Sequence, residues 1–205
     1  SAEGRYSKKL EEIKYDHIPA QILLSDAKVQ LVRLAIKKEG NQIGYIKGAG
    51  DEMPNSLRAM GYEVWELNNE DITAESLSRV DAIVFGVRAL NTNEQLRTFN
   101  PTVLAYARNG GTVIYQYNTS QGLITKDFSP YSLTLSRNRV TEEDAVVTLL
   151  DADHPVLNAP NKILQKDFEG WVQERGLYFP NAWDPAFIPI LRMNDTGEDP
   201  QDGSL

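Results

Sequence analysis

Five polar side chains follow one another directly after an apolar stretch in the middle of the chain. Val113, Ile114 and Tyr115 supply the β-branched and aromatic side chains that favour a buried strand. In an open α/β sheet, the loop after such a strand is where binding and catalytic groups usually lie. The loop here consists of Gln116, Tyr117, Asn118, Thr119 and Ser120. It contains no cysteine, and the histidine nearest to it in sequence is His154.

Three arginines form a second group of candidates. Arg88 comes directly after another apolar stretch, and Arg137 and Arg139 lie close together in the segment 135–140. Arginines near the ends of strands can clamp a carboxylate or another anionic oxygen group through paired hydrogen bonds. The alternative is a set of salt bridges to Asp144, Asp167 or Glu174.

Residues 166–176 form the densest cluster of polar and aromatic side chains. Gln173 and Glu174 lie next to Trp171, with further charged groups on either side. An aromatic platform beside amide, carboxylate and guanidinium groups is typical of a sugar-binding surface. The same residues are equally typical of a lid that packs on its own domain.

Composition excludes several classes of function. The net charge of −8, with no basic run beyond Lys37-Lys38, argues against binding to nucleic acid or to an anionic membrane. No stretch approaches the length that spans a bilayer. The absence of cysteine removes disulfides, thiolate metal sites and thiol nucleophiles. His17 and His154 lie far apart without a carboxylate cluster, so structural roles are favoured over a metal site.

The order of the predicted elements indicates an α/β fold. Residues 1–40 are interpreted as a lead-in from an upstream domain, with a short helix at 6–15 and a strand at 29–36. Apolar patterning and turn signals then predict strands at 43–47, 63–67, 81–86 and 112–117, and helices at 53–60, 71–77 and 91–108. We expect Asp51 to cap the first helix, the segment Asp71-Ile-Thr73 to cap the second, and Pro101 to kink or split the third.

This alternation predicts right-handed crossovers and a parallel sheet of strand order 2-1-3-4. We therefore expect a flavodoxin-like, three-layer domain over residues 41–205, with a ligand crevice between the loops 48–52 and 87–93. The second half is less regular and has a strand at 146–150. The polar end of the chain predicts that the domain stops just before its closing strand and helix.

Several long motifs resemble a known group of proteins. These motifs are residues 43–51, 62–64, 115–118, 134–142 and 166–176. They are similar to the C-terminal region of bacterial PIG-L/LmbE-type deacetylases, a region that resembles the class I glutamine amidotransferase fold. Residues 153–155, with a distal Phe and Glu, also resemble ThuA-like members of that superfamily.

The resemblance implies a domain that has lost its chemistry. Class I amidotransferases carry a nucleophilic cysteine on a glycine-flanked turn, which here reads Tyr115-Gln-Tyr-Asn-Thr119. The zinc motif of the deacetylases does not occur in these residues either. The resemblance thus implies no cofactor in this chain, a zinc-dependent deacetylase domain upstream as its partner, and a bacterial periplasmic or envelope location, with the cytoplasm left open.

The sequence therefore predicts a non-catalytic domain that binds or positions a carbohydrate-like ligand, or stabilises the enzyme. The candidate binding residues are Arg88, Asn91, Gln116, Asn118, Arg137, Arg139, Gln173 and Glu174. We expect Gln116 and Asn118 to share a cavity with Arg88. Two alternatives stay open: a ThuA-like hydrolase or isomerase that uses Glu174 or His154 as acid or base, and a structural interface built on the Trp171 cluster. A homo-oligomer is compatible with each.

Overall fold

The computed structural model describes residues 6–29, 33, 35–170 and 176–203. Contacts between Cα atoms divide the chain into two units, Ser1–Ala35 and Ile36–Leu205. The first unit contributes a two-stranded ribbon, and the second contains all of the buried apolar clusters.

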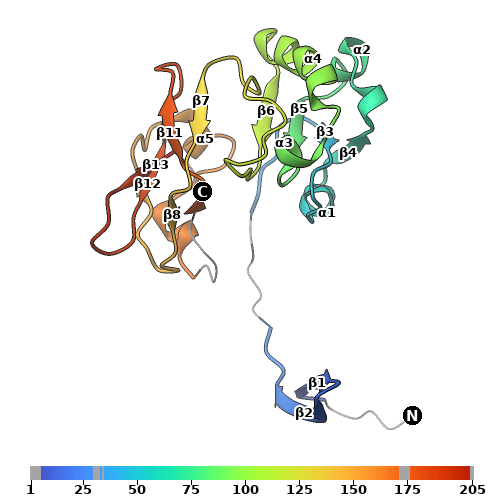
Figure 1. Ribbon diagram of the computed structural model, residues 1–205, viewed down its shortest axis with the longest axis vertical. Coiled ribbons are helices and arrows are strands. Elements are labelled where there is room, and N and C mark those ends of the chain that lie inside the picture. The colour runs from blue at the N-terminus through green and yellow to red at the C-terminus, as the bar shows by residue number, and fades with distance from the viewer. Residues whose placement is uncertain (1–5, 30–32, 34, 171–175, 204–205) are drawn as a thin grey trace. The chain divides into compact units, whose positions relative to one another are not determined.

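The second unit begins with a parallel sheet of four strands (Figure 1). These are β3 (Gln42–Ile46), β4 (Glu63–Leu67), β5 (Ala82–Phe85) and β6 (Thr112–Tyr115). Their order across the sheet is β4-β3-β5-β6, which confirms the predicted order 2-1-3-4. All three neighbouring pairs are parallel, so the loops that follow β3, β5 and β6 meet at one edge of the sheet.

Helices cover both faces of this sheet. They are α1 (Met53–Ala59), α2 (Ala74–Leu77), α3 (Ala89–Thr92) and α4 (Leu96–Arg108), with a 3₁₀ turn at Asn69–Asp71. On one face, Tyr45 and Val84 pack against Leu57 of α1. On the other, Phe85 packs in one cluster with α2 and with Val103 of α4. Side chains alternate between faces along each strand, so the central strands β3 and β5 contribute apolar, buried side chains to both faces.

One helix start confirms the expectation and another differs from it. Thr73, the last residue of the predicted capping segment 71–73, caps α2, because its hydroxyl accepts a hydrogen bond from the Ser76 N–H while the Ser76 side chain accepts one from the Thr73 N–H. The helix predicted at 91–108 is two helices, and the break lies between α3 and α4. Pro101 lies inside α4 without dividing it.

Strand β6 lies at the edge of the sheet, as the order 2-1-3-4 predicts, but it is only half-buried, so the expectation of a buried strand is wrong. Within the described residues β6 pairs only with β5. Val113 and Tyr115 pack on the core, whereas Ile114 on the opposite face is 48% exposed. The next strand, β7 (Leu133–Leu135), does not continue the sheet, because it pairs with β11 (Pro180–Trp183).

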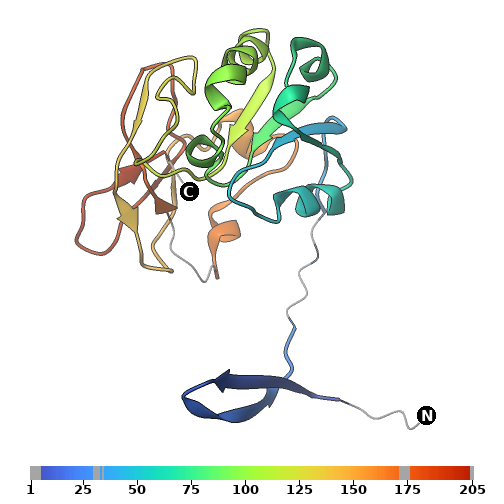
Figure 2. The same ribbon diagram turned by 45° about the vertical axis from the view of Figure 1, so that its right-hand side comes forward.

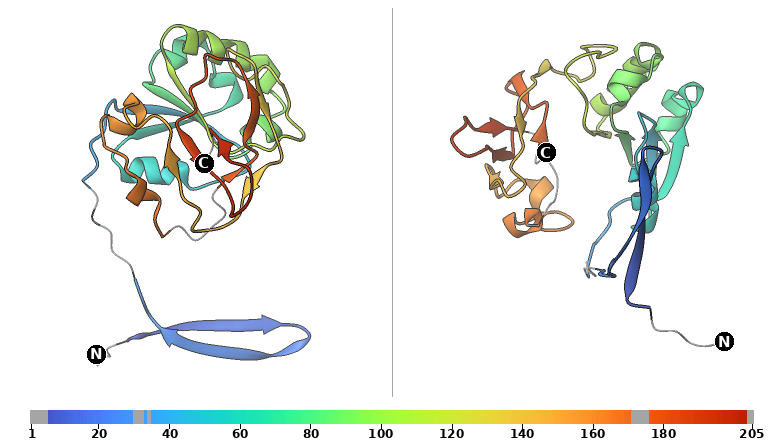
Figure 3. Two further views of the ribbon diagram at one scale, coloured as in Figure 1. Left: turned by 90° about the vertical axis from the view of Figure 1, so that its left-hand side faces the viewer. Right: turned by 60° about the horizontal axis from the view of Figure 1, so that its bottom comes forward.

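The rest of the second unit consists of short antiparallel strands, coloured yellow to red in Figure 3. The remaining elements are β8 (Arg139–Val140), β9 (Thr148–Leu149), α5 (Pro155–Asn158), a 3₁₀ turn (Gln165–Phe168), β10 (Gly176–Leu177), β12 (Leu191–Met193) and β13 (Gln201–Asp202). The strand predicted at 146–150 is the two-residue β9. A separate cluster that includes Val140, Phe179 and Met193 forms the core of this part.

The first unit contains no helix in its described residues, so the helix predicted at 6–15 is wrong. The segment forms β1 (Lys8–Tyr15), which pairs antiparallel with β2 (Ile18–Asp26), drawn dark blue in Figure 2. Its apolar residues find cross-strand partners, as in the Leu10–Leu24 pair. The strand predicted at 29–36 lies partly outside the described residues, and its described residues belong to no strand.

Two glycines allow the loops after β3 and β5 to come into close contact. A Cβ atom on Gly48 would lie 2.1 Å from the Val87 carbonyl oxygen, and one on Gly86 would lie 2.3 Å from the Tyr45 hydroxyl. Neither distance is possible for a real side chain. The two loops can therefore touch only while both positions lack a side chain.

We expect Gly48→Ala to lower the free energy of unfolding by about 2 to 3 kcal/mol, because the new methyl group overlaps backbone that cannot rotate away. Chemical denaturation measures the change. Gly122→Ala is the control: its Cβ would meet nothing within 4 Å, so only its positive φ of 73° opposes the substitution, at about 1 kcal/mol. Equal losses in the two variants would contradict the close contact.

Candidate functional site

The loops after β3 and β5 are joined directly to each other. The Ala49 N–H donates to the Val87 carbonyl at 2.8 Å, and the Val87 N–H donates to the Asp51 carboxylate at 2.8 Å. The crevice that we predicted between the loops 48–52 and 87–93 is therefore closed where these residues meet. The reason is the pair of glycines, which lets the backbones approach until they bond.

Asp51 is the centre of this contact. Its carboxylate also accepts hydrogen bonds from the Tyr45 hydroxyl at 2.8 Å, from the Met53 N–H at 2.9 Å and from Gln116 Nε2 at 3.4 Å. Burial alone would raise the pKa of Asp51, but the bonds from Val87, Tyr45, Met53 and Gln116 together hold that pKa below its ordinary value. Asp51 was expected only to cap α1; it joins groups from all three loops.

Asn91 and Asn118 bind backbone. Asn118 Oδ1 accepts from the Leu90 N–H at 3.0 Å, and its Nδ2 donates to the Gln116 carbonyl at 2.7 Å. Asn91 accepts from the Thr119 N–H at 2.9 Å and donates to the carbonyls of Thr119 and Gln121. These amides hold the loop after β6 against α3. Their role is therefore to position that loop.

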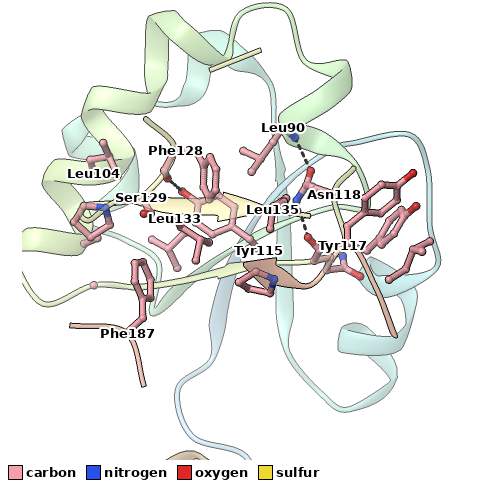
Figure 4. Close-up of a pocket in the computed structure, with 18 residues that line it drawn as sticks. Leu90, Leu104, Tyr115, Tyr117, Asn118, Phe128, Ser129, Leu133, Leu135 and Phe187 are labelled. Atoms are coloured by element: carbon pink, nitrogen blue, oxygen red, sulfur yellow. Dashed lines mark hydrogen bonds between the residues drawn. The ribbon is translucent and has the colours of Figure 1, made fainter. Parts of the chain in front are cut away.

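A cavity of about 410 Å³ lies beside the exposed edge of β6 (Figure 4). Its walls come from α4, from β6 and the loop after it, from residues 128–135, and from residues 177–187. Gln116 and Asn118 both line it, as predicted, but Arg88 does not. The cavity thus lies on the β6 side of the sheet edge, away from the closed contact of Val87 with Ala49.

The cavity is lined mainly by aromatic and apolar side chains. Tyr115, Tyr117, Phe128, Tyr178 and Phe187 all contribute to it. The Tyr115 hydroxyl donates to the Phe128 carbonyl at 2.6 Å, and burial raises the pKa of that phenol. Because the Tyr115 hydroxyl already has a hydrogen-bond partner, Tyr115 offers a ligand only the face of its ring. Polar contacts that select a ligand must then come from other lining groups, such as Gln116.

Two residues with left-handed backbone flank Tyr117. Arg88 has φ of 58° and its N–H donates to the Tyr117 carbonyl at 2.7 Å. Tyr178 has φ of 56°, and its ring centroid lies 5.7 Å from that of Tyr117. Positive φ costs a residue with a large side chain free energy, and such residues concentrate at binding and catalytic sites. Both therefore mark Tyr117 as a position that the fold holds in place.

The remaining candidates lie elsewhere. Arg139 begins β8, where it pairs with Leu177, and Arg137 precedes β8; both are exposed and neither lines the cavity. Gln173 and Glu174 lie outside the described residues, as does Trp171. His154 caps α5, since its Nδ1 accepts from the Val156 N–H at 3.3 Å. This bond supports its predicted structural role.

The sequence did not predict the residues that form the wall of the cavity opposite β6. Phe128, Tyr178 and Phe187 reach it from segments that have no regular periodicity around them. The signal in the sequence was the excess of aromatic residues after residue 168. Nothing in their spacing shows that they face the edge of a sheet formed by residues 112–115.

We expect Asp51→Asn to lower the free energy of unfolding by about 1 to 3 kcal/mol, because several donors lose a charged acceptor. The pKa of Asp51 is lower in the folded chain, so its stabilisation is full above the ordinary value of 3.8 and is lost as pH falls through the folded pKa. Denaturation from pH 7 to pH 2.5 should show the difference from the unsubstituted chain shrinking below about pH 4. The exposed Asp144→Asn is the control, and a difference independent of pH would contradict this role.

The backbone at Tyr178 supports a second prediction. Tyr178→Gly and Tyr178→Ala remove the same ring, but only glycine adopts φ of 56° at little cost. The glycine variant should therefore be more stable than the alanine variant by about 1 kcal/mol. Thermal denaturation compares the two. The same pair of substitutions at Tyr131, whose φ is not positive, should favour alanine; a glycine variant of Tyr178 below its alanine variant would refute the strain.

The described residues contain no group of three or more His, Cys, Asp or Glu side chains that could hold a metal ion. Among the same residues, no helix is long and apolar enough to cross a membrane. Comparison of the chain with protein-family models, with curated proteins and with solved structures gave no match.

Proposed function

We propose that this chain is a non-catalytic domain that binds a carbohydrate-like ligand in the cavity beside β6. The observation that supports the proposal is the composition of the cavity wall, in which aromatic rings surround Gln116, an amide side chain with a free acceptor oxygen. Gln116 uses its Nε2 to reach Asp51, and no hydrogen bond joins its Oε1 to any described residue. Sugars present C–H faces to aromatic rings and hydroxyls to amides, so this combination suits them.

The fold supports a finer assignment, which is also a proposal. The strand order β4-β3-β5-β6 and the helices on both faces support a flavodoxin-like domain. We infer that the domain belongs to the class I glutamine amidotransferase-like group and accompanies a PIG-L/LmbE-type deacetylase. Gln116 and Tyr117 then occupy the turn that carries the nucleophile in active amidotransferases, where they bind and do not react.

An interaction role is the second candidate, and the first unit favours it. The β1–β2 ribbon exposes Leu10, Ile22 and Leu24, which lie on one face and are each at least 60% exposed. A ribbon of two strands is marginally stable alone, and a partner that buries its apolar face would stabilise it. The proposed upstream deacetylase domain is one such partner. A sugar-active hydrolase has less support, because His154 is engaged as a helix cap.

A screen of glycans and amino sugars by calorimetry tests the binding proposal. Once a ligand is found, Gln116→Ala and Tyr117→Ala should each raise its Kd about fivefold or more, since each removes a contact of roughly 1 kcal/mol. Arg88→Ala is the matched control, because its side chain is exposed and does not line the cavity. Equal affinity in all four proteins, or weakening by Arg88→Ala alone, would remove the cavity as the site.

A further inference from the structure

A groove with three cationic side chains runs along the outer side of α4. Arg97, Pro101, Leu104 and Arg108 line it from the helix, at positions i, i+4, i+7 and i+11. This spacing places them on one stripe of the helix surface. The segment 125–127 forms the opposite wall, and the volume enclosed is about 590 Å³.

Two side chains of α4 hold that opposite wall in place. Arg97 Nε donates to the Ile124 carbonyl at 2.6 Å, and Asn100 Nδ2 donates to the Asp127 carbonyl at 2.6 Å. These bonds lie on either side of Lys126, which also lines the groove. The two bonds therefore fix the backbone that carries Lys126 against the helix that carries Arg97 and Arg108.

The three cations have no carboxylate partner in the described part of the chain. Arg97, Arg108 and Lys126 take part in none of its ion pairs. The chain as a whole carries a net charge of −8. A groove with three unpaired cations and one carboxylate, Asp127, is thus locally positive on an acidic protein, and it attracts anions at close range.

The groove adjoins the cavity. Leu104 lines both of them. The segment that follows β6 also serves both, since Lys126 and Asp127 line the groove while Phe128 and Ser129 line the cavity. A chain-like ligand in the cavity would therefore reach the cations by passing Leu104.

We propose that the ligand of the cavity is an acidic oligosaccharide, whose carboxylate or sulfate groups lie in the groove. This inference rests on the proposed function and names the class of its ligand. Arg97 and Arg108 lie roughly 16 Å apart along the helix axis, so an extended chain with repeated charges fits them better than one small anion does. The described lining of the groove contains no aromatic ring on which bases could stack, which argues against single-stranded nucleic acid.

Calorimetry with tetrasaccharides of equal length tests the proposal. The probes are a neutral N-acetylated amino sugar, a galacturonate and a sulfated galactan, each titrated at 50 mM and 500 mM salt. At least one acidic probe should bind about tenfold more tightly than the neutral one at low salt, and this advantage should vanish at high salt. The double variant Arg108→Gln/Lys126→Gln, which removes no hydrogen bond between described residues, should abolish the advantage and leave neutral binding unchanged.

The control is Arg137→Gln/Lys162→Gln, which changes net charge equally at exposed positions that line neither site. Equal binding of neutral and acidic probes overturns this inference but leaves the proposed function standing. No binding of any probe defeats the proposed function itself. Two further results would show a general anion-binding patch and also overturn the inference. One is an affinity for the acidic probes that Tyr117→Ala leaves unchanged, and the other is an equal affinity of single-stranded DNA for the same sites.

Discussion

The carboxylate of Asp51 is the contact on which the edge of the sheet formed by the loops after β3, β5 and β6 depends. It accepts hydrogen bonds from Tyr45 on β3, from Val87 after β5 and from Gln116 after β6. Parallel strands bring these groups to one edge, and a carboxylate accepts several strong hydrogen bonds at once, here from β3 and from the loops after β5 and β6. The bonds lower the pKa of Asp51 against the effect of burial, so the group stays ionised and keeps accepting at neutral pH.

This contact also explains where the cavity lies. In a doubly wound sheet the usual site is the crevice at the switch point, here between the ends of β3 and β5. Gly48 and Gly86 let those two ends touch, and Asp51 fastens them. Space remains on the other side of β6, because β6 is an edge strand and β7 turns away to pair with β11. Closing the crevice and ending the sheet at β6 together leave an aromatic-lined cavity next to Gln116.

Much of the parallel sheet could be predicted, because its strands are short apolar or alternating segments that pack on neighbours close in sequence. The same reasoning failed at β1, where Leu10 and Ile13 fit a helical spacing but pair across a ribbon. It placed Gln116 and Asn118 at the cavity but also Arg88, whose N–H donates to the Tyr117 carbonyl and whose side chain does not line the cavity. The wall of the cavity opposite β6 depends on pairs such as Tyr117 and Tyr178, which are 61 residues apart in sequence, and no local pattern encodes such a contact.

The strained residues and the cationic groove bear on one question, which is why the cavity persists. An apolar cavity that serves no ligand would gain stability by collapse, since its walls lack packing partners. Instead, Arg88 and Tyr178 hold unfavourable backbone conformations that fix Tyr117 at its rim. In the groove on the other side of Leu104, the side chains of Arg97 and Asn100 donate hydrogen bonds to the segment that carries Lys126. Strain beside the cavity and positioning beside the adjoining groove are features of a preorganised binding site, so they support the proposed binding role over a purely structural one.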